Sequence, residues 1–231
     1  MSILNIVHAN IVVKEEFELN AYRLLFFLTL LNLLNFVDRQ LIASFSNFIV
    51  PDLGLTNAQY GFLTTIPFIV FYSVAGLFMG ILADMVNRPR LIAFGVILWS
   101  VFTALTGAAK GFVSMALPRI FIGVGESILT PTSMSLLSDS FPSKRMGFAA
   151  GFYYMGVPIG VGVSLLIAGY LGESLGWRNC FYLLGGIGLA LGLSALLFKD
   201  RPRKNIKEDE PQQTLSKDTT LEIVKTLYKA L

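Results

Sequence analysis

The sequence predicts an all-α, polytopic membrane protein with six transmembrane helices. Hydrophobic residues make up 54% of the 231-residue chain and charged residues only 14%, whereas soluble domains carry about 25% charged residues. The apolar residues form continuous runs close to the ~20 residues that a helix needs to cross a bilayer. Transmembrane strands would instead alternate in polarity over ~10-residue segments. We place the six spans at residues 22–49, 59–83, 90–110, 113–138, 146–171 and 178–198.

The rare residue types exclude most enzyme chemistries. A single cysteine, Cys180, rules out an internal disulfide and a cysteine metal cluster. The single histidine, His8, lies outside every predicted span. The sequence therefore lacks the residues for a catalytic triad, a haem ligand pair or a histidine metal site. We expect no enzyme activity, no cofactor and no metal. The net charge of +3 comes largely from loops and the tail, so it concerns membrane orientation and indicates no nucleic-acid partner.

Three regions follow from the distribution of charge along the chain. Residues 1–21 lack the basic start and cleavage site of a signal peptide, so we expect a cytoplasmic N-terminal segment that stays in the mature chain. Residues 22–198 form the six-helix transmembrane bundle. Residues 199–231 turn polar and are predicted to be a cytoplasmic linker. The linker ends in an amphipathic helix over 221–231, with a possible capping box at Thr219 and Glu222.

The first span carries a polar stripe. Asn32, Asn35 and Arg39 recur at helical spacing, with Asp38 on the flank of the stripe. Asp38 lies about 24 Å from the inner end of its span at 1.5 Å per residue. Arg119 lies about 10 Å from the outer end of the fourth span. In a hydrocarbon core of ~30 Å these depths are similar, so an Asp38–Arg119 pair is geometrically possible.

The fourth span carries two full charges within an apolar run. Arg119 and Glu126 are two helical turns apart, so both project from one face about 10 Å apart. Gly123 and Thr130 continue that face. A charge at mid-bilayer costs roughly 2.5–3.5 kcal/mol even on lenient scales, so it faces protein or a watery cavity. Two interpretations stay open: a structural ion pair between helices, or a substrate or proton site.

A short loop joins the second and third spans. Gly80 and Asp84 close one helix, and Arg88 and Arg90 open the next. Asn87 tolerates the left-handed conformation that tight reversals often need. The plainer interpretation is an ordinary loop of the positive-inside kind.

The fifth span is rich in glycine. Two pairs of small residues four apart, Gly147/Gly151 and Gly156/Gly160, allow close helix contact in lipid. Pro158 should kink the helix because it lacks a backbone donor.

The reversal before the sixth span repeats the acid–turn–base order of Asp84 to Arg88 on the opposite side of the membrane. Glu173 precedes the turn at Gly176, and Arg178 follows it. Trp177 fits an aromatic interface anchor.

Basic residues predict the orientation of the bundle. With the N-terminus inside, only Lys110 and Arg178 lie in the outer gaps. The inner side then holds Lys14, Arg23, Arg88, Arg90, Lys144, Arg145 and the basic tail from Lys199 to Lys207. Both termini are therefore expected in the cytoplasm.

Three motifs together resemble the major facilitator superfamily. Its loop motif, Gly-x-Leu-Ala-Asp-Arg-x-Gly-Arg-Lys, is matched by Gly80, Leu82, Ala83, Asp84 and Arg88. The sequence departs from that motif at Met85, Asn87 and Pro89. Arg119-x3-Gly123-x-Gly125-Glu126 resembles the helix-four motif of the superfamily. Together with Asn35-x-x-Asp38-Arg39, it is most similar to the Spinster-like branch, with the anion symporters second.

The resemblance implies the N-terminal six-helix half of a transporter, built as two inverted three-helix repeats. It implies secondary active transport by alternating access in a bacterial inner membrane, with symport or antiport linked to protons. The substrate would be a lysolipid-like amphiphile or a small organic anion. Arg39 and Arg119 would attract the anionic group, Asp38 and Glu126 would carry protons, and Gly80, Asp84, Arg88 and Arg90 would form a gating loop.

The expected partners are protons, membrane lipids and a second six-helix bundle, supplied by a missing C-terminal half or by a dimer partner. The alternative is a non-transporting membrane scaffold, or a half-module that assembles with a partner bundle. In that alternative the buried charges would be only structural.

Overall fold

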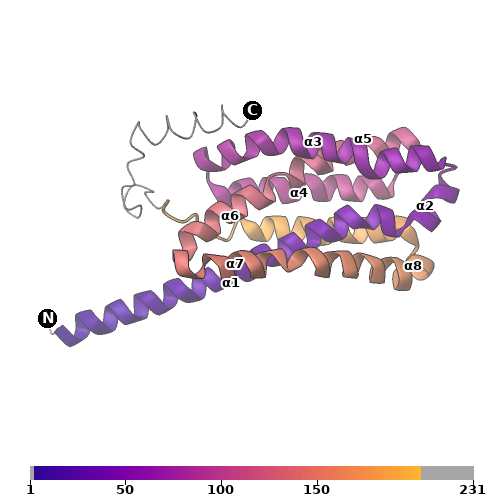
Figure 1. The fold of residues 1–231 in the computed structure, drawn as a ribbon. Coiled ribbons are helices and arrows are strands. Elements are labelled where there is room, and N and C mark those ends of the chain that lie inside the picture. Colours follow the sequence, from indigo (N-terminus) through magenta and orange to yellow (C-terminus); the bar gives the residue numbers. More distant parts are fainter. Residues whose placement is uncertain (1–2, 204–231) are drawn as a thin grey trace, which may run out of the picture. The chain divides into compact units, whose positions relative to one another are not determined.

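The computed structural model describes residues 3–203, with side chains from Glu18 onward, and its elements are helices (Figure 1). The bounds of these helices are α1 Ile3–Ser44, α2 Ser46–Asp52, α3 Asn57–Met85, α4 Arg88–Gly107, α5 Phe112–Glu126, α6 Leu129–Ser140, α7 Ser143–Tyr154 and α8 Gly156–Ala195.

Among the described residues, five helical stretches are long and apolar enough to cross a membrane, and the length of the last one allows two crossings. That stretch, Ser143–Ala195, has 53 residues, which is about 80 Å of helix at 1.5 Å per residue and far more than one crossing needs. Gly176 interrupts it with φ 76° and ψ 153°, a conformation open to glycine. The chain reverses there, and the two arms of α8 run back alongside each other in Figure 1. The prediction of six all-α spans is confirmed.

Two prolines set the breaks within the fourth and fifth spans. Pro131 cannot donate to the carbonyl of Ser127, and α5 gives way to α6 at Ser127 and Ile128. Pro158 likewise cannot donate a backbone hydrogen bond to the carbonyl three to four residues before it. That position is the junction of α7 and α8. The kink predicted for Pro158 thus appears at Met155, one turn before the proline.

Asn87 has a different role from the predicted one. Its backbone is extended, with φ −67° and ψ 113°, and its side chain caps α4 by accepting a hydrogen bond from the Arg90 amide at 3.1 Å. No non-glycine residue in the described chain has positive φ. The left-handed turn was therefore the wrong prediction. An extended Val86–Asn87 link with a side-chain cap satisfies the first amides of α4 just as well.

Glycines bring several helices into close contact, and two of these contacts fix the arms of α8. A Cβ on Gly160 would lie 2.6 Å from the Leu33 carbonyl oxygen of α1, and one on Gly185 would lie 2.7 Å from Ala104 of α4. The first arm of α8 therefore packs on α1 and the second arm on α4. The contact predicted for the Gly156/Gly160 pair is confirmed. Gly147 and Gly151 have open space around them within the described bundle, so that pair makes no such contact there.

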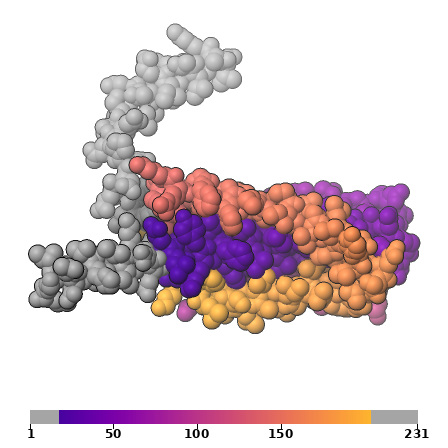
Figure 2. Space-filling view, turned by 90° about the horizontal axis from the view of Figure 1, so that it is seen from below, coloured from indigo at the N-terminus to yellow at the C-terminus, as the bar shows by residue number. Residues whose placement is uncertain are grey.

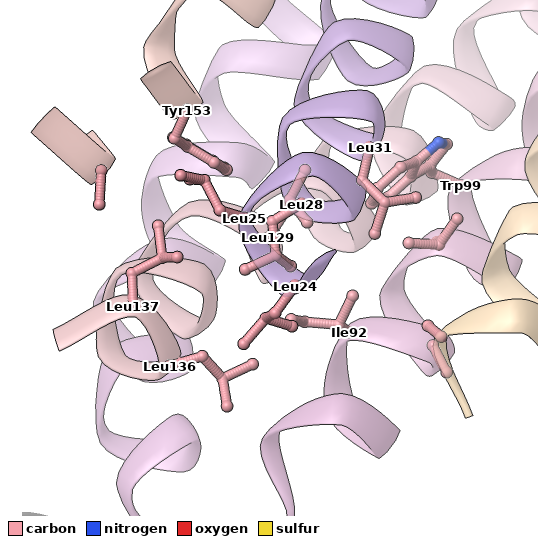
Figure 3. Close-up of a cluster of buried hydrophobic side chains, with 14 of the residues drawn as sticks. Leu24, Leu25, Leu28, Leu31, Ile92, Trp99, Leu129, Leu136, Leu137 and Tyr153 are labelled. Atoms are coloured by element: carbon pink, nitrogen blue, oxygen red, sulfur yellow. The ribbon is translucent and has the colours of Figure 1, made fainter. Parts of the chain in front are cut away.

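Buried side chains form two main apolar clusters along the bundle. The first gathers Leu24 to Leu31 of α1 around Trp99 and Tyr153 (Figure 3). The second gathers the later half of α1 around Met115 and Phe181. The polar stripe of α1 begins at Asn32, between the two clusters, and continues alongside the second. Helix α3 exposes much of its apolar surface, with Leu77 75% exposed, as expected of a surface that faces lipid or another bundle.

The two ends of the chain bear on the predicted regions. Helix α1 begins at Ile3, so the predicted boundary at residue 21 falls inside one continuous helix. The amphipathic helix predicted over 221–231 lies outside the described residues. The cytoplasmic placement of both regions stays a prediction.

Candidate functional site

An ion pair between Arg39 of α1 and Glu126 at the end of α5 forms the centre of the candidate site. The Arg39 Nε and Nη2 atoms donate to Oε2 of Glu126 at 3.1 and 2.9 Å. Nη2 also donates to the Asn35 side-chain oxygen at 3.4 Å. The Glu126 side chain is fully buried, while that of Arg39 is 26% exposed. Among the described residues no hydrogen bond uses Arg39 Nη1 or Glu126 Oε1. Both atoms therefore remain open to a ligand or a proton.

Three aromatic rings surround the Arg39 guanidinium. Its Cζ atom lies 4.8 Å from the centre of the Phe36 ring, and 4.7 Å from the centres of the Phe68 and Tyr72 rings. Each distance is within the range for a cation–π attraction, which strengthens as water is excluded. Arg119 approaches the same Phe68 ring, with its Cζ 5.0 Å from the ring centre. Phe68 therefore lies between the two arginines and contacts both.

The predicted Asp38–Arg119 pair does not form. Within the described residues no ion pair joins them. Asp38 instead accepts a hydrogen bond from the Thr103 hydroxyl of α4 at 3.4 Å. The reason is helical phase: Asp38 is about 100° around α1 from Arg39, so it faces α4 while Arg39 faces Glu126. Asp38 and Arg119 are each 2% exposed, and Oδ1 of Asp38 accepts no hydrogen bond from any residue that the structure describes.

The loop arginine Arg88 lies inside the bundle and joins three segments of the chain. It is 0% exposed. Its guanidinium pairs with Asp139 at the end of α6, and its Nε donates to Asp200 at 2.8 Å. It also bonds the Ser135 carbonyl and hydroxyl oxygens at 3.2 and 3.1 Å, and the Arg201 carbonyl. Sequence reasoning missed both carboxylates, although each stands at the same end of the bundle as Arg88.

The other three residues of the predicted gating loop are not gathered around Arg88. Asp84 and Arg90 are exposed, and the bond that Arg90 makes within the described part of the chain is from its backbone amide to the Asn87 cap. Gly80 borders open space. Together they present a surface at the end of α3 and the start of α4 that leaves room for another element.

A second charged cluster closes the opposite end of the bundle. Asp52 of α2 pairs with Arg178 and accepts a hydrogen bond from the Trp177 indole at 3.1 Å. Arg178 also donates to the Ala109 carbonyl at 3.2 Å. These bonds join the ends of the first, third and sixth spans. The indole is 4% exposed, so Trp177 is a packed residue of this cluster and not the interface anchor that we predicted.

Apolar spans packed around a buried ion pair define an integral membrane protein of the polytopic helical class. The sequence profile of the Major Facilitator Superfamily matches residues 28–229. The chain belongs to this family. Its predicted similarity to the Spinster-like branch, as an N-terminal half, is also confirmed.

The known relatives include a member of the Spinster-like branch and a transporter of an organic anion, the two kinds of relative that the motifs indicated. The chain is 30% identical, over 91% of its length, to the "probable sphingolipid transporter spinster homolog 1" of Arabidopsis thaliana, of which it covers 46%. It is 29% identical, over 79% of its length, to the hexuronate transporter of Bacillus subtilis, of which it covers 43%. The chain thus spans about half the length of these relatives.

A solved structure shows the same fold. It is a bacterial homologue of the human lysosomal transporter Spinster in an inward-facing, unoccupied conformation. Its TM-score to this chain is 0.76 at 29% sequence identity, covering 85% of this chain and 47% of the other.

Proposed function

We propose that this chain is one half of a secondary active transporter that works by alternating access and is coupled to protons. The observation that carries the proposal is the Arg39–Glu126 pair in the middle of the spans, with Arg39 partly exposed. A purely structural pair would be expected to use its donors and acceptors fully. Here Nη1 of Arg39 and Oε1 of Glu126 remain unused. An anionic group can occupy the first and a proton the second.

The substrate is an organic anion or a lysolipid-like amphiphile. Arg39 supplies the positive charge, and Phe36 and Tyr72 beside it supply apolar surface suited to the remainder of the molecule. The names of the relatives support both classes, since one is a probable sphingolipid transporter and another a hexuronate transporter. Arg119 adds a second positive charge behind Phe68.

Glu126 and Asp38 are the proton carriers in this proposal. Burial and a nearby arginine shift the pKa of a carboxyl group in opposite directions. Movement of Arg39 toward a substrate would change that balance at Glu126. A second six-helix bundle covers the Arg39–Glu126 site, either as a further half or as a dimer partner. In the gating role, Asp84 and Arg90 contact that second bundle, while Arg88 holds the loop in place from inside.

The test is uptake against pH in proteoliposomes that contain this chain with its second bundle. Labelled glucuronate and labelled lysophosphatidate serve as the two probes, for wild type and Glu126→Gln. We expect a folded Gln variant whose residual exchange has lost most of its pH dependence, because its amide cannot carry a proton between the two states and only Asp38 remains as a carrier. Glu173→Gln, an exposed carboxylate at the end of the bundle, is the control and should keep the wild-type profile.

The same experiment separates transport from the scaffold alternative. A scaffold predicts that Glu126→Gln lowers the yield of folded protein and that neither probe crosses the membrane in the wild type. A folded Glu126→Gln variant with an unchanged pH profile would return Glu126 to a structural role.

A further inference from the structure

A cavity of about 210 Å³ lies apart from the charged centre, at the end of the bundle where α1 enters its span. Its floor is apolar and buried, with Ala21 2% and Phe141 3% exposed. Glu18 and Tyr22 of α1 and Arg145 of α7 form its rim. Figure 2 shows the coloured part of α1, in indigo, beside the salmon-coloured α7. The cavity is smaller than the ~300–1,000 Å³ typical of pockets for drug-sized ligands.

The depth of the cavity is that of lipid headgroups. Two membrane-spanning stretches end or begin beside it: Ser140 is the last residue of one, and the next begins at Ser143. The polar headgroup layers extend outward from the ends of such spans, which fill a hydrocarbon core of about 30 Å. A ligand at this level therefore comes from the membrane more readily than from the transport route.

The charges on the rim are opposite and only loosely joined. The distance from Arg145 Nη1 to Glu18 Oε2 is 3.7 Å, longer than the 2.7–3.2 Å of a protein N–H···O hydrogen bond. The two side chains are 52% and 49% exposed, so separating them costs little. A simple anion would meet the Glu18 carboxylate, and a simple cation would meet the Arg145 guanidinium. A ligand that carries both charges complements both residues.

We propose that this cavity binds the headgroup of an aminophospholipid, in which a phosphate and a primary ammonium are two carbons apart. The phosphate binds Arg145, whose planar guanidinium suits bidentate contact with phosphate oxygens. The ammonium inserts between the phosphate and Glu18, donates to its carboxylate and lies against the Tyr22 ring. That ring is fixed by an edge-to-face contact with Phe141 at 5.4 Å. The inference does not depend on the proposed transport function.

The test is lipid-dependent thermal unfolding of the purified 231-residue chain in detergent, followed by the fluorescence of its two tryptophans. The probes are dihexanoyl phosphatidylethanolamine, dihexanoyl phosphatidylcholine, dihexanoyl phosphatidylglycerol and soluble O-phosphorylethanolamine. A ligand that binds only the folded state raises the unfolding temperature with its concentration. We expect an apparent affinity about fivefold higher for phosphatidylethanolamine than for the other two lipids, as for a half-exposed charge-assisted contact. Phosphorylethanolamine should have no effect at the same concentration.

Variants assign the two charges separately. Glu18→Gln should lower the apparent affinity for phosphatidylethanolamine to that for phosphatidylcholine. Arg145→Gln should weaken the binding of all three lipids. Arg145→Lys keeps the charge and should weaken their binding to a lesser extent, and it serves as the test if Arg145→Gln does not fold. Lys144→Gln removes the same charge one residue away, outside the cavity lining, and should leave the lipid preference unchanged.

Three results would overturn the proposal. One is equal stabilisation of the wild type by all three lipids. Another is a preference for phosphatidylglycerol that depends on Arg145 alone, which would define an anion site. The third is an effect of phosphorylethanolamine equal to that of the lipid, which would point to a soluble ligand.

Discussion

At the scale of single residues, the chain treats its buried charges in two ways. Arg88 is fully satisfied, with two carboxylates and further oxygens around one guanidinium. Arg39 has one carboxylate, three aromatic rings and an unused donor edge. A buried arginine with every donor paired holds its neighbours in one arrangement. An arginine with a free edge has room for a ligand, so our proposal assigns a structural role to Arg88 and a binding role to Arg39.

Replacing Arg88 by alanine should destabilise the folded chain by about 3 kcal/mol, since breaking a buried pair leaves its carboxylates unpaired. Asp139 would lose most, because its side chain is 9% exposed against 24% for Asp200. Arg90→Ala is the matched control two residues away. That side chain is exposed, and its loss should cost less than about 0.5 kcal/mol. Equilibrium unfolding in mixed micelles measures both, and equal losses would show that Arg88 does not join the segments around it.

At the scale of helices, close packing depends on where a glycine faces. Gly160 meets the backbone of α1 and the Cβ of Phe36, one of the rings around Arg39. Gly162 is two residues later on the same helix, and a Cβ added there would have no neighbouring atom within 4 Å. The same residue type in one helix therefore has two different consequences for stability.

Gly160→Ala should destabilise the chain by about 1–3 kcal/mol, because the added methyl group forces α1 and α8 apart. Gly162→Ala should be neutral or stabilising by up to about 1 kcal/mol, because alanine is the better helix former. The pair is compared by thermal unfolding at one detergent concentration. A neutral Gly160→Ala would mean that the helices separate without cost and that the contact is not tight.

The two terminal arginine clusters are related in the way that inverted repeats require. In such repeats the third span corresponds to the sixth and the fourth to the first. Arg88 begins the third span and pairs with Asp139 at the end of the fourth. Arg178 begins the sixth span and pairs with Asp52, just after the first. Each arginine also donates to a carbonyl just past the end of the other repeat: Arg88 to that of Arg201, and Arg178 to that of Ala109.

The Asp52–Arg178 pair predicts a dependence of stability on pH. The hydrogen bond from Arg178 lowers the pKa of Asp52 below its usual value; burial opposes this shift, and the hydrogen bond from Trp177 adds to it. A carboxyl whose pKa is lower in the folded state stabilises the fold above its unfolded pKa of about 3.9 and loses this effect as the pH falls through the folded value. Arg178→Gln should therefore lower the unfolding temperature at pH 7, and the difference from wild type should shrink below about pH 4. A difference that stays constant down to pH 3 would contradict the assignment.

Helix periodicity and proline chemistry were enough to predict the spans, and motif spacing was enough to bring Arg39, Arg119 and Glu126 to one region. Partner choice was not predictable, because it depends on helix rotation. Depth alone allowed an Asp38–Arg119 pair, whereas a 100° step around α1 assigns Asp38 to Thr103 instead. The carboxylates around Arg88 were missed for a related reason. They come from segments 51 and 112 residues away, and no local pattern links them.

At the scale of the whole molecule, the two ends of the bundle differ in charge. One end carries the exposed Arg90, Lys144 and Arg145, and the other carries Lys110 and Arg178. Basic residues are retained on the cytoplasmic side of membrane proteins. The first end is therefore predicted to face the cytoplasm, together with both termini and the proposed lipid cavity.

Single cysteines test this orientation directly, because the native Cys180 is 1% exposed and gives a silent background. Asn57→Cys and Ser174→Cys place a thiol at exposed positions of the predicted outer end, and Lys144→Cys places one at the inner end. A membrane-impermeant maleimide added to intact cells should label the first two variants and leave the third unlabelled until the membrane is permeabilised. The wild-type chain should stay unlabelled under both conditions. Labelling of Lys144→Cys in intact cells, with Asn57→Cys protected, would invert the bundle. It would also place the aminophospholipid cavity in the outer leaflet. The side of the membrane from which the lysolipid or anion enters would then be reversed as well.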